Sequence, residues 1–402
     1  MNKTAFAQGF RICLPVTLVM MFVIGASAQS ETIIHTFTGG ADGSIPEGGL
    51  VSDSKGNLYG TTTGGGLSGG GTVFELSPAS DGTWSEQVLH NFGYGGDGGF
   101  PFGGVVFDSK GDIYGTTVYG GAGEGTVFQL VPGGNGTWTE NILYNFTGAS
   151  DGGSPYAGVV LDRAGNIYGT TAGGGAFEFG TVFELIAGSD GAWNEKVLHS
   201  FTGGDDGAAP YYGTLILDGA GNIDGVTGQG GFHDYGVVYE LTPGANGSWT
   251  EKVLHAFTGG AGGSGPAGGL TLDASGSLYG ASAYSAFQLT PGSDGSWTEK
   301  SLYDFVGGSD GAYPEAQLIF DKNGNLYGTT NTGGLHRGTV FKLSSTSNGL
   351  RQEKVLHRFA PDGIDGVDPF SGALVQDSSG NLYGTTPGGG TSNAGVVFEV
   401  KP

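Results

Sequence analysis

Cysteine is nearly absent from this chain, which has Cys13 as its one thiol in 402 residues. A fold held together by disulfide bonds is therefore excluded, and so is a thiol nucleophile or zinc-binding thiolate downstream of residue 13. The stability of the fold has to come from a large apolar core and a sheet topology that leaves few free edges.

Basic residues are also scarce, because 15 Lys and Arg stand against 38 Asp and Glu, which gives a formal net charge of −23 at pH 7. A field of that sign repels phosphate backbones and anionic lipid. Nucleic acid and membrane surfaces are thus excluded as partners. Cations, neutral sugars and basic proteins remain compatible with this charge.

Long apolar runs are limited to one, from Ile12 to Ile24, which is shorter than the roughly 20 residues that a spanning helix needs. Lys3 and Arg11 precede it, and the small residues 26–28 follow it, a pattern typical of a cleaved signal peptide. We expect residues 1–28 to be removed and residues 29–402 to form one domain. The product would be secreted, periplasmic or at the cell surface, monomeric and not inserted in a membrane.

The chain is rich in glycine, with 86 residues, and the glycines recur at regular intervals along the sequence. The segment Asp53-Ser-Lys-Gly-Asn-Leu-Tyr-Gly-Thr-Thr62 returns in six further copies, which start at Asp108, Asp162, Asp218, Asp273, Asp321 and Asp377. The glycine after the tyrosine position recurs every 48 to 56 residues. A period of this size indicates a repeat architecture.

Each repeat predicts two β-hairpins, and no helical periodicity is present after residue 28. In the first complete repeat, residues 49–53 and 57–62 flank a Ser-Lys-Gly turn, and residues 71–76 and 84–92 flank an Asp-Gly turn. The repeat therefore contains four short antiparallel strands.

The order of the strands distinguishes a closed ring from a linear solenoid. A fourth-strand sequence, residues 33–37, precedes every other strand, and the chain ends on a third strand, residues 396–400. Pairing these two segments would complete the last repeat and close a ring, which hides most sheet edges. The sequence predicts an all-β, seven-bladed β-propeller with four antiparallel strands per blade.

The paired motifs Gly56-Asn-Leu-Tyr-Gly-Thr-Thr62 and Gly71-Thr-Val-Phe-Glu-Leu76 resemble the GloVer tandem-repeat family of exported bacterial proteins. The resemblance covers residues 31–402. It implies a propeller-like repeat protein and supplies no catalytic residue.

Aromatic residues that follow the proline of the loop between blades are the first candidates for ligand binding, namely Phe102, Tyr156, Tyr211, Tyr212 and Phe370. Exposed rings beside carboxylates suit stacking on sugars, but the same rings would also serve as wedges between blades. Further candidates interrupt the repeat in the loops between second and third strands, namely Phe232, Tyr235, Glu178 and His233.

An Asp-Gly-x-x-Pro motif recurs in the loops between blades, with its aspartates at Asp42, Asp97, Asp151, Asp206, Asp310 and Asp365 and with Gly262 at the equivalent place in the fifth repeat. These carboxylates would hold calcium if they faced one another. The alternative, which we favour, is that each caps its own turn. No other cofactor is expected.

The favoured hypothesis is a non-enzymatic binding scaffold that presents loops on the blade-connection face to a glycan or an extracellular protein. The competing hypothesis is a polysaccharide-acting hydrolase or lyase with a site in the funnel of the propeller. An enzyme would need carboxylates that converge in that funnel.

Overall fold

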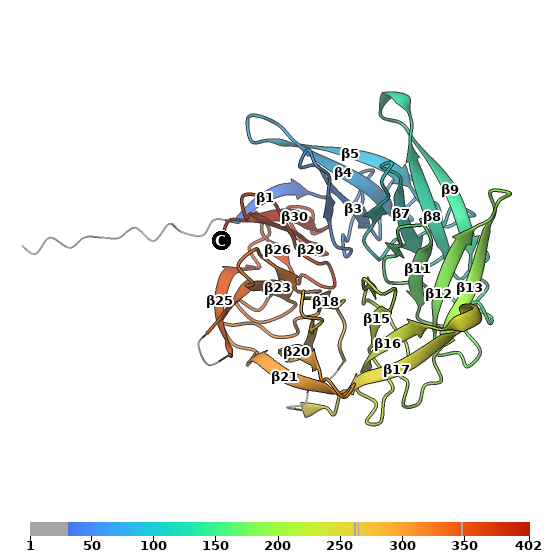
Figure 1. Cartoon of the computed structure of the whole chain (residues 1–402). Coiled ribbons are helices and arrows are strands. Elements are labelled where there is room, and N and C mark those ends of the chain that lie inside the picture. Colours follow the sequence, from blue (N-terminus) through green and yellow to red (C-terminus); the bar gives the residue numbers. More distant parts are fainter. Residues whose placement is uncertain (1–30, 261–262, 264, 347–348) are drawn as a thin grey trace, which may run out of the picture.

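The computed structural model describes residues 31–260, 263, 265–346 and 349–402, so the predicted signal peptide and Gly262 lie outside the described residues. Seven four-stranded antiparallel sheets stand around a central axis, as Figure 1 shows. This confirms the predicted seven-bladed propeller. The described helical structure consists of two 3-10 turns, Gly134–Gly136 and Ala245–Gly247. No described helix has the length and apolarity that a membrane span requires.

Six blades follow one another along the chain, each running from a two-residue inner strand to an eight-residue outer strand. Blades 1 to 3 consist of β2 (Val51–Ser52), β3 (Leu58–Thr62), β4 (Thr72–Pro78) and β5 (Trp84–Asn91); β6 (Val106–Phe107), β7 (Ile113–Thr117), β8 (Thr126–Pro132) and β9 (Trp138–Asn145); and β10 (Val160–Leu161), β11 (Ile167–Thr171), β12 (Thr181–Ala187) and β13 (Trp193–Ser200). Blades 4 to 6 consist of β14 (Ile216–Leu217), β15 (Ile223–Thr227), β16 (Val237–Pro243) and β17 (Trp249–Ala256); β18 (Thr271–Leu272), β19 (Leu278–Ser282), β20 (Ser285–Pro291) and β21 (Trp297–Asp304); and β22 (Ile319–Phe320), β23 (Leu326–Thr330), β24 (Thr339–Ser345) and β25 (Arg351–Arg358).

The seventh blade is built from both ends of the described chain. It consists of β27 (Val375–Gln376), β28 (Leu382–Thr386), β30 (Val396–Val400) and, as its outer strand, β1 (Glu31–Thr36). β1 pairs antiparallel with β30 from Glu31 opposite Val400 to Thr36 opposite Val396. The pairing that the offset strands predicted is therefore present.

Seven apolar cores, one between each pair of neighbouring blades, hold the ring together. In the core between blades 1 and 2, Phe92 packs edge-on against Phe128, with ring centroids 5.1 Å apart. The marker glycine of the repeat makes room for this ring, because a Cβ on Gly115 would lie 2.6 Å from Phe128 Cζ. Core packing thus explains the glycine that defines the repeat.

The connections between blades and the loops between second and third strands lie together on one face. Backbone bridges join them, such as Gly99 with Tyr119 and Gly153 with Gly173, and β26 (Gly366–Val367) pairs with β29 (Gly388–Gly389). This face carries every residue that the sequence predicted to bind a ligand.

Candidate ligand site at the channel mouth

The five aromatic residues after the loop prolines contact one another, although they come from four different blades. Each lies where a blade connection ends and an inner strand begins. Their ring centroids are 5.2 to 6.2 Å apart in seven contacts, and Phe102 stacks on Tyr212 at an interplanar angle of 28°. We call this set the aromatic cluster: Phe102, Tyr156, Tyr211, Tyr212 and Phe370.

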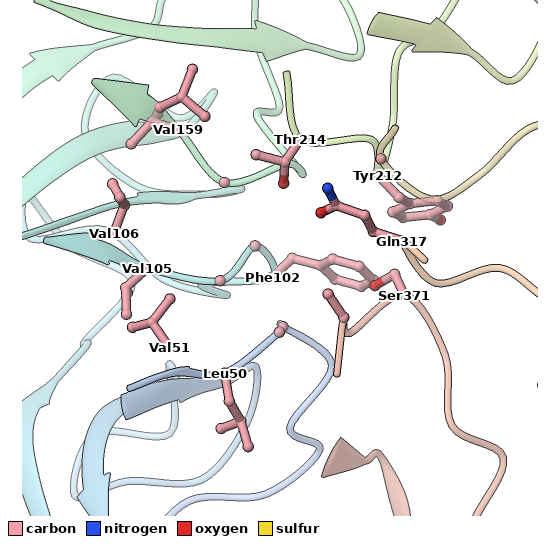
Figure 2. Close-up of a pocket in the computed structure, with 18 of the residues that line it drawn as sticks. Leu50, Val51, Phe102, Val105, Val106, Val159, Tyr212, Thr214, Gln317 and Ser371 are labelled. Atoms are coloured by element: carbon pink, nitrogen blue, oxygen red, sulfur yellow. The ribbon is translucent and has the colours of Figure 1, made fainter. Parts of the chain in front are cut away.

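The aromatic cluster borders a cavity of about 220 Å³ on the axis of the ring, which residues from all seven blades line. Figure 2 shows Phe102, Tyr212, Gln317 and Ser371 gathered around it. We call this end of the central channel the mouth. All five rings are half-buried, and none belongs to the seven cores between blades.

Threonines of neighbouring blades hold the backbone of the mouth in place. Thr116 Oγ1 donates to the carbonyl of Ala157, next to Tyr156, at 2.8 Å, and Thr61 Oγ1 donates to the carbonyl of Gly103 at 3.0 Å. The inner strands approach closely, since a Cβ on Gly103 would lie 2.3 Å from the backbone nitrogen of Gly158. The cluster is therefore mounted on a rigid support, which lowers the cost of ordering it for a ligand.

Two carboxyl groups that the sequence analysis did not single out lie at the mouth as well. Glu47 and Glu315 follow Pro46 and Pro314, the prolines of blades 1 and 6, and occupy the position that an aromatic residue fills elsewhere. Burial raises the pKa of each to about 7, and a hydrogen bond from Thr63 moderates the effect on Glu47. Both carboxylates raise the pKa of Tyr212, after burial as the largest cause, to about 12. Both glutamates therefore lie near that ring.

The other predicted ligand residues lie away from the cluster. Phe232 is 77% exposed and its ring contacts His233 at 4.8 Å, while the side chain of Tyr235 lies beside Gly259. Glu178 is exposed, and no hydrogen bond or ion pair between it and His233 exists in the described part of the chain. The loops thus present these four residues separately to solvent.

The six aspartates of the Asp-Gly-x-x-Pro motif each accept a hydrogen bond from a backbone amide of their own loop, at 2.7 to 3.0 Å. Each lies beside the histidine or tyrosine of the preceding outer strand, as His199 Nε2 does at 3.1 Å from Asp206 Oδ2. This arrangement agrees with the capping interpretation. The calcium hypothesis stays a prediction.

A glutamate from the next blade completes a recurring group at the six blade junctions that have the motif aspartate. At the first junction His90 Nε2 lies 3.4 Å from Glu140 Oε1, and the charge of Asp97 acts on both residues. We call each such set of His or Tyr, Asp and Glu a junction cluster. Burial, and secondarily the aspartate, raises the pKa of five of these glutamates to about 7: Glu86, Glu140, Glu195, Glu251 and Glu353.

These raised pKa values predict that the protein loses stability as pH rises from about 5 to about 7.5. An unfolded glutamate releases its proton near pH 4.5, whereas the folded junction glutamates keep theirs until about 7, so the free energy of unfolding falls across that window. Burial lowers the pKa of four histidines, including His90, which opposes this trend below pH 6.5. Thermal melts from pH 5 to 8 measure the net slope.

Glu140→Gln is expected to flatten that slope, because the amide does not titrate. Glu299→Gln is the matched comparison and should flatten the slope less, since burial also raises the pKa of Glu299 but the fifth repeat has Gly262 in place of the junction aspartate. A melting temperature that rises over this range, or the same change of slope in both variants, would count against the assignment.

Comparison with known proteins gives a family match and a set of propeller neighbours. The model of the Gloeobacter/Verrucomicrobia repeat matches the chain over residues 18–191, 122–286 and 285–402. None of the curated proteins is similar to the chain in sequence.

Among solved structures, virginiamycin B lyase from Staphylococcus aureus is 14% identical, with 93% of this chain and 99% of the other covered at a TM-score of 0.55. A streptogramin B lyase is also 14% identical, with coverage of 93% and 97% and a TM-score of 0.57. The extracellular domain of a hybrid two component system from B. thetaiotaomicron is 15% identical, with coverage of 93% and 41% and a TM-score of 0.52. These neighbours share the fold and include both enzymes and an extracellular domain.

Proposed function

The chain belongs to the Gloeobacter/Verrucomicrobia repeat family, and on that premise we propose that it is an exported, non-enzymatic scaffold that binds a glycan at the channel mouth. The observation that carries this proposal is the convergence of five aromatic rings from four blades at the mouth, where Phe102, Tyr156 and Tyr212 line one cavity. Sugar rings present C–H faces that pack on aromatic rings. The seven-bladed propeller holds these aromatic rings on a rigid backbone.

Charge and polarity at the mouth favour a neutral polysaccharide as the glycan. Glu47 and Glu315, with pKa values of about 7, offer carboxyl groups that donate or accept hydrogen bonds with sugar hydroxyls. The net charge of −23 repels acidic glycans. Ring contacts of about 0.5–1.5 kcal/mol each predict weak binding, with a Kd on the order of 0.1–1 mM for a short oligosaccharide.

A glycan array probed with the purified protein, followed by calorimetry on the best neutral oligosaccharide, tests this proposal. Binding to neutral glycans with this range of Kd supports it. Absence of binding to every neutral glycan, or a preference for acidic ones, contradicts it.

A second function, hydrolysis or lysis of a polysaccharide, is favoured by one observation, the raised pKa of Glu47 and Glu315. A carboxyl group that keeps its proton near neutral pH is suited to act as a general acid on a glycosidic oxygen. If the protein is an enzyme, Glu47→Gln and Glu315→Gln should each reduce the release of reducing or unsaturated ends by about 10²–10⁴-fold.

The two functions differ in one measurement, which is product release from a polysaccharide that the protein binds. For the scaffold, the unaltered protein releases no product, and both glutamine variants retain most of their binding. Product release that both variants abolish would replace the scaffold with the enzyme.

A further inference from the structure

One junction cluster differs from the others, and it lies where the ring closes. Glu31 of β1, His357 of β25 and Asp365 of the connection to blade 7 each place one ligand atom within 4.8 Å of the other two. His357 Nε2 lies 3.1 Å from Asp365 Oδ2. Among the described residues this is the one group of three or more His, Cys, Asp or Glu side chains that meets such a spacing.

Two oxygens of this group are buried and lack a hydrogen-bond partner. The side chain of Asp365 is 9% exposed, its Oδ2 accepts the amide of Ala360 at 2.8 Å, and its Oδ1 has no partner. Glu31 Oε1 is likewise buried without a partner. Leaving a buried carboxylate oxygen unpaired costs free energy. Unpaired glutamate oxygens recur in the other junction clusters, but among the described residues only this cluster has an unpaired aspartate oxygen beside an imidazole as well, and that combination points to a missing ligand of positive charge.

A longer loop explains why this cluster is tighter than the others. Eight residues separate His357 from Asp365, whereas seven separate His199 from Asp206. The capping amide lies five residues before Asp365 but four before Asp206. The extra residue changes the position of the aspartate relative to the glutamate of the next blade, and the cluster of His199, Asp206 and Glu251 does not reach the same spacing.

We propose that Glu31, His357 and Asp365 bind one divalent transition-metal ion of the zinc type, which joins β1 to the loop that enters blade 7. An imidazole with two carboxylates is a ligand set for zinc rather than for calcium, which takes oxygen ligands alone. Neighbouring ligands in a tetrahedral zinc site lie about 3.3 Å apart, close to the spacing between His357 Nε2 and Asp365 Oδ2. Water completes the coordination.

The surrounding charge supports a cation at this place. The carboxylates of Asp365 and Asp362 both lie close enough to Glu31 to act on it electrostatically. The imidazole of His357 is the one basic group among the side chains that act on it. A divalent ion would offset this excess of carboxylate charge.

Zinc chloride titrated into purified protein stripped with a chelator tests the site. We expect one zinc per chain and a rise of about 3 °C in the melting temperature when zinc exceeds its Kd by about 100-fold. Asp365→Asn and Glu31→Gln should each weaken zinc binding by about 10-fold or more. Asp206→Asn and Glu251→Gln, which alter the cluster without this spacing, should leave the zinc Kd unchanged.

Failure of the unaltered protein to bind zinc would overturn the proposal, as would equal zinc affinity in the Asp365→Asn and Asp206→Asn variants. An equal rise in melting temperature with calcium chloride would overturn the assignment to a transition metal. Residue 31 lies on the outer strand of blade 7, so Glu31→Gln could disturb the fold. Circular dichroism of this variant distinguishes a loss of zinc binding from a loss of folded structure.

Discussion

Deleting residues 31–37, which form β1 and the adjoining Phe37, is expected to open the ring and leave the protein aggregated or with a melting temperature lowered by more than 10 °C. β30 would become a free edge strand, although Val396, Val397, Phe398 and Val400 are fully buried along it. Phe37 itself is fully buried against Phe74 at 5.2 Å, and loss of such a side chain alone costs about 3–5 kcal/mol. Size-exclusion chromatography and calorimetry measure both outcomes.

A circular permutant is the matched control for this deletion. Glu31 pairs with Val400, so a short Asp-Gly turn from residue 402 to residue 31 would convert β30 and β1 into the same kind of hairpin that the other blades have. New ends at residues 204 and 205, in an exposed loop, keep every strand. The permutant should fold as the natural chain does. A stable deletion variant, or an unfolded permutant, would contradict closure by β1.

Replacing Tyr156, Tyr211 and Tyr212 together with alanine is expected to abolish glycan binding while the propeller stays folded. The three rings take part in six of the seven ring contacts of the aromatic cluster, yet they lie outside the cores between blades. Loss of the platform should weaken binding by about 10-fold or more, as about 0.5–1.5 kcal/mol is lost per ring. Calorimetry with the array-selected oligosaccharide measures the change, and circular dichroism measures the fold.

Phe232→Ala serves as the control, because this ring is 77% exposed on the same face and makes no ring contact with the cluster. It should bind as the unaltered protein does. If the triple variant binds normally, or if Phe232→Ala loses binding, the site lies in the outer loops. If the triple variant unfolds, the rings are structural wedges between blades.

The fold was predictable because the sequence pattern that determines its strands and turns is repeated along the chain. The marker glycine, the tight turns and the apolar strands recur in every repeat, so the strands predicted for one repeat apply to all seven. The offset of residues 33–37 from residues 396–400 then determined the closure. Local patterns of this kind report strands and turns directly.

The candidate site was predictable in part. The aromatic residues after the loop prolines were predicted to bind a ligand, but the sequence did not show that their rings contact one another. Eight residues separate Pro210 from Asp218, whereas seven separate Pro155 from Asp162, and this insertion gives blade 4 two rings at the mouth. Glu47 and Glu315 were not predicted to bind a ligand because a lone carboxylate after a loop proline is typical of a solvated loop. The position after the proline, shared with Phe102, was the signal that could have found them.

The junction clusters could not be predicted from one repeat, because each takes its glutamate from the next blade. Glu140 lies in the outer strand Trp138-Thr-Glu-Asn141 on the same face as Trp138, but a charged residue on an outer strand is typical of a solvated face. Neighbouring blades bury it against His90. The group of Glu31, His357 and Asp365 depends further on closure, which brings together residues more than 300 positions apart.

The central claim, that the channel mouth is the ligand site, is tested most directly by a crystal structure of the protein with the array-selected oligosaccharide. The account predicts electron density for a sugar ring packed on Phe102, Tyr156 or Tyr212, with a hydroxyl within hydrogen-bond distance of Glu47 or Glu315. Density on the loops around Phe232 and Glu178, with the mouth empty, would contradict it.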